Sequence, residues 1–187
     1  MTTMIAIWTL MVTTGADTPP TLRIAKPSFE LPSTIEFVLT AAGKPGPVQK
    51  DYQPLVRLAN IRENVVVAQP GPFDLWWIPK VGVAVRVIGN VPATSFEKPI
   101  PLDRSLGAVR VRGDNLPRID KLVLTPLRDP GPGEKGHQPI QFVNDFRDDL
   151  VVPEGEYELW LVPSNGARPQ RIDDKLRVQA GKVTIRD

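Results

Sequence analysis

The chain has 187 residues, of which 41% are hydrophobic and 24% are charged, and its formal net charge is +2. This length allows one large domain or two small ones, and the near balance of charge excludes a polybasic nucleic-acid arm or an acidic tail. The chain has no Cys and a single His, His137, which excludes thiol catalysis, disulfides and His-rich metal sites within one chain. The 21 Pro and 14 Gly residues favour short strands and tight turns over long helices.

The N-terminal segment differs in composition from the rest of the chain. An apolar stretch from Ile5 to Val12 is followed by small residues up to Ala16, which fits a signal-peptidase site ahead of Asp17. The segment contains no Lys or Arg, and its apolar run is too short to span a bilayer. A buried N-terminal strand or a misassigned start would also account for it. We expect a signal peptide over residues 1–16, with the mature protein secreted, periplasmic or bound in the cell envelope.

The remaining chain repeats itself with an offset of 85 residues. "FVLTAAGKPGPVQKDYQP" from Phe37 aligns with "LVLTPLRDPGPGEKGHQP" from Leu122, and "IRENVVV" from Ile61 aligns with "FRDDLVV" from Phe146. One residue is then lost, so that "GPFDLWWIP" from Gly71 aligns with "GEYELWLVP" from Gly155. This period is too long for a solenoid repeat and suits a small domain. We therefore predict an internal duplication, with one domain over residues 17–105 and a second over residues 106–187.

Short apolar segments separated by turn residues make up the second half. We expect strands over residues 107–112, 120–127, 139–144, 149–153, 156–163, 169–179 and 182–187. The turn signals recur about every 8 to 12 residues, which is typical of a β-sandwich. In "EYELWLV" the side chains of Tyr157, Leu159 and Leu161 share one face of the strand. Phe73 and Leu75 alternate in the same way with Trp77, so we predict an all-β fold with these apolar residues in the core.

In both halves an aromatic residue lies two positions after a Gly, at Gly71 and Phe73 and at Gly155 and Tyr157. The Gly suits a turn with positive φ, and the aromatic residue begins the next strand. This pattern, with a turn at Gly181 before the last strand, resembles the prealbumin-like, carboxypeptidase-regulatory-like modules of bacterial envelope proteins. The resemblance implies two tandem immunoglobulin-like, prealbumin-like β-sandwich domains that serve as spacer, binding or accessory modules without catalytic residues. The first half departs from the pattern, because "DLWWIPKVGVAVRV" has an apolar hairpin in place of a polar one.

Trp76 and Trp160 occupy equivalent positions, and Trp77 lies beside the first of them. Exposed indoles form flat apolar surfaces that stack on sugar rings. Trp76, Trp77 and Trp160 are therefore the candidate ligand-binding residues. The alternative is that a loop or the neighbouring module covers these side chains.

An acidic segment follows the third expected strand of the second half. Asp145, Asp148 and Asp149 present oxygen atoms of the kind that calcium binds, although their spacing is not that of an EF-hand and Arg147 would oppose a cation. The equivalent residues of the first half are Asn60, Glu63 and Asn64. A turn stabilised by Asx side chains explains the pattern equally well, so the three aspartates are weak calcium candidates.

No catalytic motif emerges from the sequence. His137 with Glu134 or Asp145 has the residue types of an acid–base pair. However, the counterpart of His137 in the first half is Tyr52, and the surrounding "PGPGEKG" loop is poorly suited to hold catalytic geometry. We expect a non-catalytic, exported spacer or protein-interaction module without cofactors, whose partners are proteins or polysaccharides of the cell envelope rather than nucleic acid. The alternatives are a carbohydrate-binding accessory module and an enzyme with an unrecognised acidic site.

Overall fold

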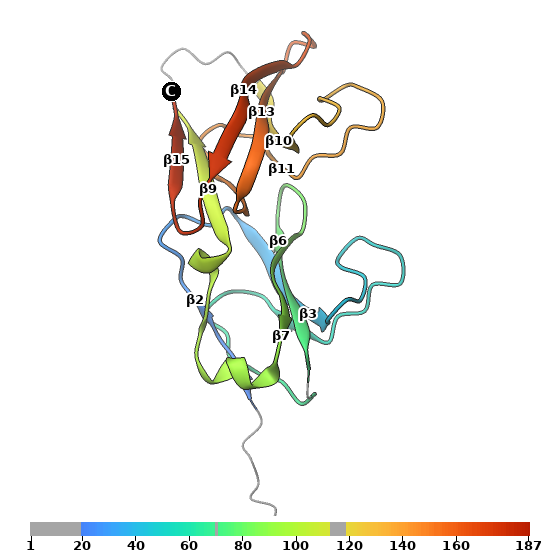
Figure 1. The fold of residues 1–187 in the computed structure, drawn as a ribbon, viewed down its shortest axis with the longest axis vertical. Coiled ribbons are helices and arrows are strands. Elements are labelled where there is room, and N and C mark those ends of the chain that lie inside the picture. The colour runs from blue at the N-terminus through green and yellow to red at the C-terminus, as the bar shows by residue number, and fades with distance from the viewer. Residues whose placement is uncertain (1–19, 70, 113–118) are drawn as a thin grey trace, which may run out of the picture.

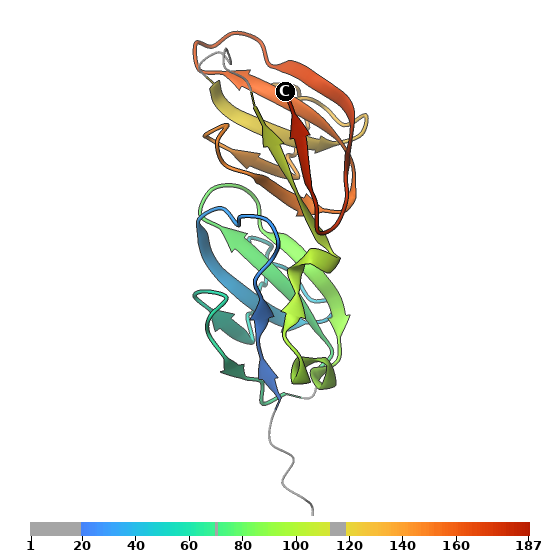
Figure 2. The same cartoon turned by 90° about the vertical axis from the view of Figure 1, so that its left-hand side faces the viewer.

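The structure is a computed structural model that describes residues 20–69, 71–112 and 119–187, so the predicted signal peptide lies outside the described residues. Within those ranges the chain forms β-strands and two short 3-10 helices, η1 (Ala93–Glu97) and η2 (Leu102–Arg104). The predicted all-β fold is confirmed. Two strand-rich units lie end to end along the long axis of the molecule (Figures 1 and 2).

The first unit is built on a four-stranded antiparallel sheet. Its strands, in order across the sheet, are β4 (Val56–Leu58), β3 (Thr34–Ala41), β6 (Phe73–Pro79) and β7 (Val85–Val91). Two strand pairs form the opposing layer: β1 (Thr21–Leu22) with β5 (Val65–Val66), antiparallel, and β2 (Ile24–Ala25) with β8 (Ile100–Pro101), parallel. Side chains of both layers meet in one hydrophobic cluster, the first cluster, which includes Leu22, Phe37 and Trp77.

The second unit has the same two kinds of layer. Its four-stranded antiparallel sheet runs in the order β11 (Gln141–Val143), β10 (Ile119–Pro126), β13 (Gly155–Pro163) and β14 (Gln170–Val178). The opposing three-stranded sheet runs in the order β12 (Leu150–Pro153), β9 (Leu106–Val111) and β15 (Val183–Arg186), with β15 parallel to β9. Their facing side chains form the second cluster, which includes Val109, Leu122 and Leu159.

The strand registers of the two four-stranded sheets correspond. Phe37 pairs with Trp77 and with Leu58 in the first unit, as Leu122 pairs with Leu161 and with Val143 in the second. The parallel pair also recurs, because Ile24 lies opposite Ile100 and Val109 lies opposite Thr184. The sequence alignment at an offset of 84 to 85 residues is thus matched by equivalent backbone pairing in these sheets.

The predicted core residues Phe73, Leu75, Tyr157 and Leu159 are buried, with exposed fractions of 8% or less. The seven strands expected in the second unit are present, each with ends within two residues of the expected ones. In β13 and β14 buried side chains alternate with more exposed ones, which gives a period of two, whereas β9 and β12 are buried at nearly every position and are marked by apolar residues between turns. The burial of the four core side chains follows from this period of two.

The turn glycines give a mixed result. Gly71 has a φ of 75°, as predicted, and Gly181 lies in the predicted turn before the last strand, with a φ of 71°. The prediction for Gly155 is wrong, because Gly155 lies within β13 and is not in the positive-φ region. A Cβ at this position would lie 3.0 Å from the hydroxyl oxygen of Tyr157, so a side chain here would need the tyrosine ring to shift by a few tenths of an ångström.

Candidate functional site

The Pro-Gly-Pro loops cover the two equivalent tryptophans. A Cβ built on Gly46 would overlap the Trp76 indole, and one built on Gly131 would overlap the Trp160 indole in the same way. Each indole N–H donates to a threonine hydroxyl 3.1 Å away, on Thr40 or Thr125 respectively. Both indoles are half-buried. The loops therefore pack against the outer end of each six-membered ring and cover part of the indole surface that a bound sugar would use.

Trp77 lies in the core of the first unit. Its side chain is 0% exposed, and its indole N–H donates to the Thr34 hydroxyl at 2.9 Å. Buried in this way, Trp77 has no face available to a ligand. The prediction that Trp76 and Trp160 bind a ligand stays a prediction, limited to the part of each indole that the loop leaves uncovered.

Asp74 of β6 and Glu158 of β13 occupy equivalent positions, and each accepts a hydrogen bond from the loop of its own unit that packs on the tryptophan. Asp74 accepts hydrogen bonds from the backbone N–H of Gly43 at 3.2 Å and of Asn90 at 2.8 Å. Glu158 accepts from the backbone N–H of Arg128 at 3.2 Å and pairs with Arg171 at 3.1 Å. Because these buried carboxylates are hydrogen-bonded to the backbone, they have a structural role that needs no catalytic explanation.

Substitution of Gly131, which packs against the Trp160 ring, by Ala tests this packing. Gly131→Ala is expected to lower the free energy of unfolding by about 1–3 kcal/mol, because the new methyl group must displace the Trp160 ring or the loop. In a Trp160→Leu background the same substitution should cost clearly less, because the ring that it displaces is absent. Chemical denaturation of the four proteins of this cycle measures the coupling, and an equal cost in both backgrounds would contradict the packing.

His137 and Glu134 stabilise the second loop from within. The Nδ1 atom of His137 lies 3.0 Å from the Pro130 carbonyl oxygen, and the Glu134 carboxylate accepts from the Gly131 N–H at 3.1 Å. In the first unit Gln49, at the position equivalent to Glu134, accepts from the Gly46 N–H at 2.7 Å. A neutral amide thus makes the bond that a carboxylate makes in the other loop, which is expected of a structural contact rather than an acid–base pair.

The acidic segment forms a turn. Asp145 accepts a hydrogen bond from the backbone N–H of Arg147 at 2.9 Å, as Asn60 does from that of Arg62. This is the Asx turn that the sequence allowed as the alternative to calcium. In the described part of the chain no cluster of three or more His, Cys, Asp or Glu residues is arranged to hold a metal ion.

Asp149, the third calcium candidate, is engaged by an arginine. Its side chain is 3% exposed, and its two oxygens accept from Nε and Nη2 of Arg110 at 2.7 and 2.8 Å. The hydrogen bond to Asp149 raises the pKa of Arg110 above its usual value. This bidentate pair crosses from β9 to the start of β12, so the carboxylate contributes to the sheet contact of the second unit.

Tyr157 links the two layers of the second unit. Its hydroxyl donates to the Pro153 carbonyl oxygen at 2.8 Å, across the corner where the chain passes from β12 to β13. Burial raises the pKa of this phenol above its ordinary value of 10.0. The bond from a tyrosine hydroxyl to the backbone a few residues upstream is the geometry of a tyrosine corner.

The raised pKa predicts an alkaline loss of stability. Above pH 10 the unfolded chain ionises its tyrosines while folded Tyr157 stays protonated, so the free energy of unfolding falls as pH rises through this range. Tyr157→Phe should make the decline shallower, and the part that remains includes Tyr52, whose pKa burial also raises. Urea denaturation of both proteins between pH 8 and about pH 11 measures the slopes. Identical slopes would contradict the prediction.

The two units meet through a hydrophobic junction. Leu106 and Ala108 of β9, and Val151 of β12, belong to the first cluster, although their strands pair within the second unit. Their neighbours on the other face, such as Val109 and Leu150, belong to the second cluster. The three-stranded sheet is therefore buried on both faces where it borders the first unit.

Polar contacts support this junction. The Gln141 side chain accepts from the Val83 N–H at 2.8 Å and donates to the Val83 carbonyl at 3.2 Å, which fixes the hairpin between β6 and β7 against β11. The Ser28 hydroxyl donates to the Gly181 carbonyl at 3.0 Å. A single residue, Ser105, separates η2 from β9. The apolar hairpin of the first half is thus the one that packs against the second unit.

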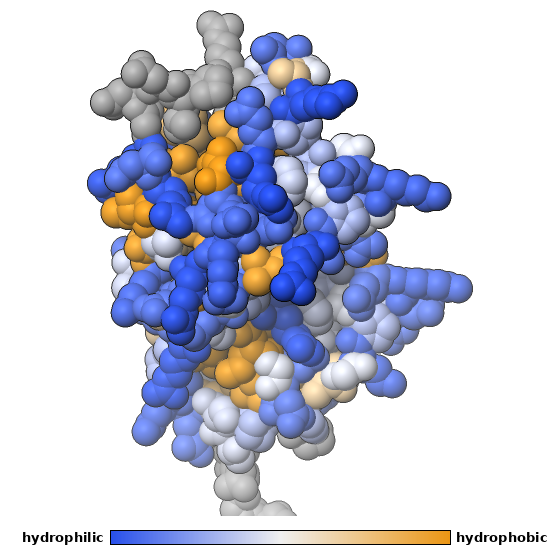
Figure 3. Space-filling model, turned by 45° about the horizontal axis from the view of Figure 1, so that its top comes forward, coloured by the Kyte–Doolittle hydropathy of each residue, from blue (hydrophilic) through white to orange (hydrophobic). Residues whose placement is uncertain are grey.

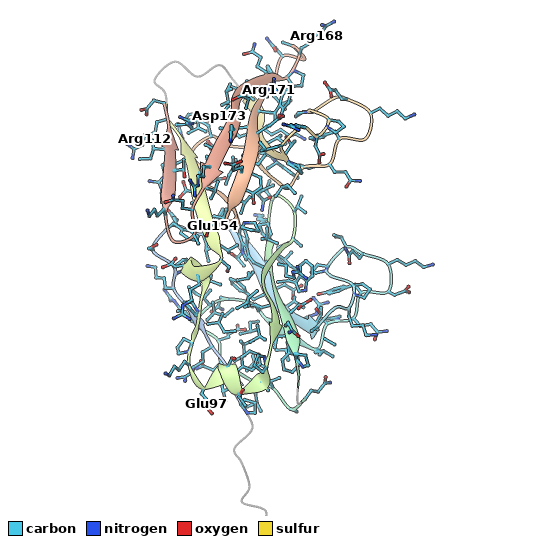
Figure 4. The ribbon with its side chains drawn as sticks, viewed as in Figure 1. Glu97, Arg112, Glu154, Arg168, Arg171 and Asp173 are labelled. Atoms are coloured by element: carbon cyan, nitrogen blue, oxygen red, sulfur yellow. The ribbon has the colours of Figure 1, made fainter. Side chains whose placement is uncertain are left out.

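A hollow of about 530 Å³ opens at the far end of the second unit, between β14 and the end of β15. It is lined by Val111, Leu159, Leu161, Arg171, Ile172, Asp173, Asp174, Arg186 and Asp187. Figure 4 labels Arg171 and Asp173, both on β14 at this end, and Figure 3 shows apolar surface between hydrophilic side chains there. Sequence reasoning missed this site, because its residues come from four separate strands and their flanks.

Comparison with protein-family models, curated proteins and solved structures gives no match for this chain. Among the described residues no helix is long and apolar enough to cross a membrane.

Proposed function

We propose that the chain consists of two tandem immunoglobulin-like, prealbumin-like β-sandwich modules that arose by internal duplication. The equivalent strand registers in the two four-stranded sheets support this proposal. Positive φ values also recur in the loop that follows β3 in the first unit and β10 in the second. In that loop Val48 and Asp51 of the first unit have φ values of 63° and 64°, and the equivalent Gly133 and Gly136 have 87° and 86°. The tyrosine corner at Tyr157 is a further feature found in immunoglobulin-like sandwiches.

We propose that this tandem protein acts without catalysis, as a rigid spacer or protein-interaction module. The observation that carries the proposal is the junction, where Leu106, Ala108 and Val151 extend the first cluster into the second unit. Domains joined by small polar contacts move relative to each other, whereas a hydrophobic interface holds them in one orientation. A spacer needs a fixed length, and an interaction module needs fixed surfaces, and the junction supplies both.

The place of action belongs to the same proposal. Export is supported by the apolar stretch from Ile5 to Val12 and the small residues before Asp17. The chain has no Cys, so its modules contain no disulfide that depends on the redox state of the compartment. We propose proteins or polysaccharides of the cell envelope as partners. A carbohydrate-binding role is less well supported, because loops pack on Trp76 and Trp160 and Trp77 is buried.

Rotational diffusion of the intact protein tests the rigid spacer. Backbone ¹⁵N relaxation rates from the two units should fit one common diffusion tensor, because the junction prevents independent tumbling. The control carries Ala108→Asp, which places a charge in the buried junction, and its units should tumble faster and separately. If the unmodified protein already behaves like the control, the rigid-spacer function is wrong.

A further inference from the structure

A second hollow, the hairpin hollow, lies on the outer face of the four-stranded sheet of the second unit. It has a volume of about 560 Å³ and is lined by the loop between β10 and β11 and by the β13–β14 hairpin, in which Figure 4 labels Arg168. Its floor includes Lys121 and Val162, which lie directly opposite each other on β10 and β13. Residues paired in this way share one face of a sheet, so the strand register places both side chains in the hollow.

The hairpin hollow has apolar surface that a ligand can reach. Val162 of the floor, Pro132 of the loop and Pro169 of the hairpin are only half-buried, and Ala167 of the hairpin is exposed. Accessible aliphatic groups therefore line the hollow from three separate segments of the chain. A concave site of this volume, with apolar walls and a few polar groups, is typical of small-molecule binding. The walls suit the faces of a flat ring.

The charge that lines the hairpin hollow is positive. The Lys121 ammonium lies 5.5 Å from the centroid of the Phe142 ring in a cation–π contact, and no Asp or Glu is among the described residues that line the hollow. In the first unit the equivalent residue is Glu36, which pairs with Arg57. The positive charge at this position thus belongs to the second unit alone. A carboxylate is the ligand group that complements it.

His137 adds a hydrogen-bond acceptor. Its Nδ1 atom lies 3.0 Å from the Pro130 carbonyl oxygen, and because a carbonyl oxygen only accepts, Nδ1 must carry the proton. In the neutral imidazole Nε2 is then an acceptor, and within the described part of the chain no hydrogen bond engages it. The half-buried imidazole lines the hollow. A hydroxyl group on a ligand can donate to this nitrogen.

We propose that the hairpin hollow binds a small aromatic carboxylate that carries a hydroxyl group on its ring. The ring lies against Val162, with Pro132 and Pro169 beside it. The carboxylate lies next to the Lys121 ammonium, and the hydroxyl donates to Nε2 of His137. This site goes beyond the proposed spacer function, which rests on the junction at the other end of the second unit, so the two can be tested separately.

Titration of the full chain with 4-hydroxybenzoate, followed by NMR, tests the proposal. We expect saturable shifts in the methyl signals of Val162 and in the imidazole signals of His137, the single histidine of the chain, with half-saturation at about 1 mM. 4-Hydroxybenzamide keeps the hydroxyl and lacks the charge, whereas benzoate keeps the charge and lacks the hydroxyl. Each should bind about fivefold more weakly. Equal binding of either analogue, or the absence of saturable shifts at Val162 and His137, would overturn the proposal.

Three variants test the charge at the hairpin hollow. Lys121→Gln should weaken 4-hydroxybenzoate binding at least about fivefold and leave 4-hydroxybenzamide binding unchanged. Ala167→Asp changes an exposed residue, so it should fold even if Lys121→Gln does not, and its carboxylate should weaken 4-hydroxybenzoate binding at least about threefold by like-charge repulsion. The control is Lys50→Gln in the equivalent loop of the first unit, which should leave the affinity unchanged. Unchanged affinity in Ala167→Asp or in folded Lys121→Gln, or an equal loss in Lys50→Gln, would refute the site. Relaxation data on the same samples report on the rigid spacer separately.

Discussion

Tyr157→Ala is expected to lower the free energy of unfolding of the second unit by about 3–5 kcal/mol, because it removes a buried aromatic ring and leaves a cavity. The ring belongs to the second cluster, and its hydroxyl donates to Pro153. A domain has only about 5–15 kcal/mol of stability in total, so this unit should unfold or nearly unfold at ambient temperature. Thermal melts followed by NMR signals of each unit measure the effect.

The control for this substitution is Tyr157→Phe. It keeps the ring and removes only the hydroxyl, so it should cost about 0.5–1.5 kcal/mol, the net value of one hydrogen bond. Phe73 already occupies the equivalent position in the first unit, stacked on Phe96 with ring centroids 5.6 Å apart. A loss in Tyr157→Ala no larger than that in Tyr157→Phe would show that the ring is not part of a packed core.

Tyr157→Ala should also lower the stability of the first unit. When the second unit unfolds, the first cluster loses the side chains of Leu106, Ala108 and Val151 that extend it across the junction. We therefore expect the melting temperature of the first unit to fall as well, by less than that of the second. Complete independence of the two melts would contradict the junction, and one identical shift for both would mean that the units share a single cooperative core.

Local patterns in the sequence predict the strands well and the contacts between strands less well. The apolar alternation of "EYELWLV" identifies β13 and its buried face, because a strand has a side-chain period of two. The same alternation places Trp77 on the face of Phe73 and Leu75, so its burial was available from sequence. It remained among the ligand candidates because it neighbours Trp76, whose side chain points to the other face.

Other features depend on residues distant in sequence. The packing of Gly46 and Gly131 on the indoles brings together a loop and a strand about 30 residues apart, and no periodicity predicts such a contact. The sequence does contain a difference between the two units at the junction, but only the structure shows what this difference is for. The hairpin residues "KVGVA" from Lys80 are apolar where they meet the second unit, and the equivalent "SNGAR" from Ser164 is polar and exposed at the free end. The hollow between β14 and the end of β15 likewise brings together side chains from four strands, and no local pattern predicts such a grouping.

Ala108→Asp is expected to disrupt the junction while leaving the strands of the second unit in place. The side chain of Ala108 is 0% exposed and belongs to the first cluster, so an aspartate there has no cationic partner among apolar neighbours. An uncompensated buried charge costs about 3–5 kcal/mol, and the protein can avoid this cost by separating its two units. We expect a lower melting temperature for the first unit and separate diffusion tensors for the two units in ¹⁵N relaxation.

The repeat provides the matched control, because Arg23 is the residue equivalent to Ala108 and donates from an exposed position to the Glu97 carbonyl at 2.8 Å. Arg23→Asp should cost no more than about 1 kcal/mol and leave the common tumbling intact, since it places a charge where water already reaches. If Ala108→Asp proves as mild as Arg23→Asp, the outer face of β9 is not buried against the first unit and the junction cannot hold the two units in line.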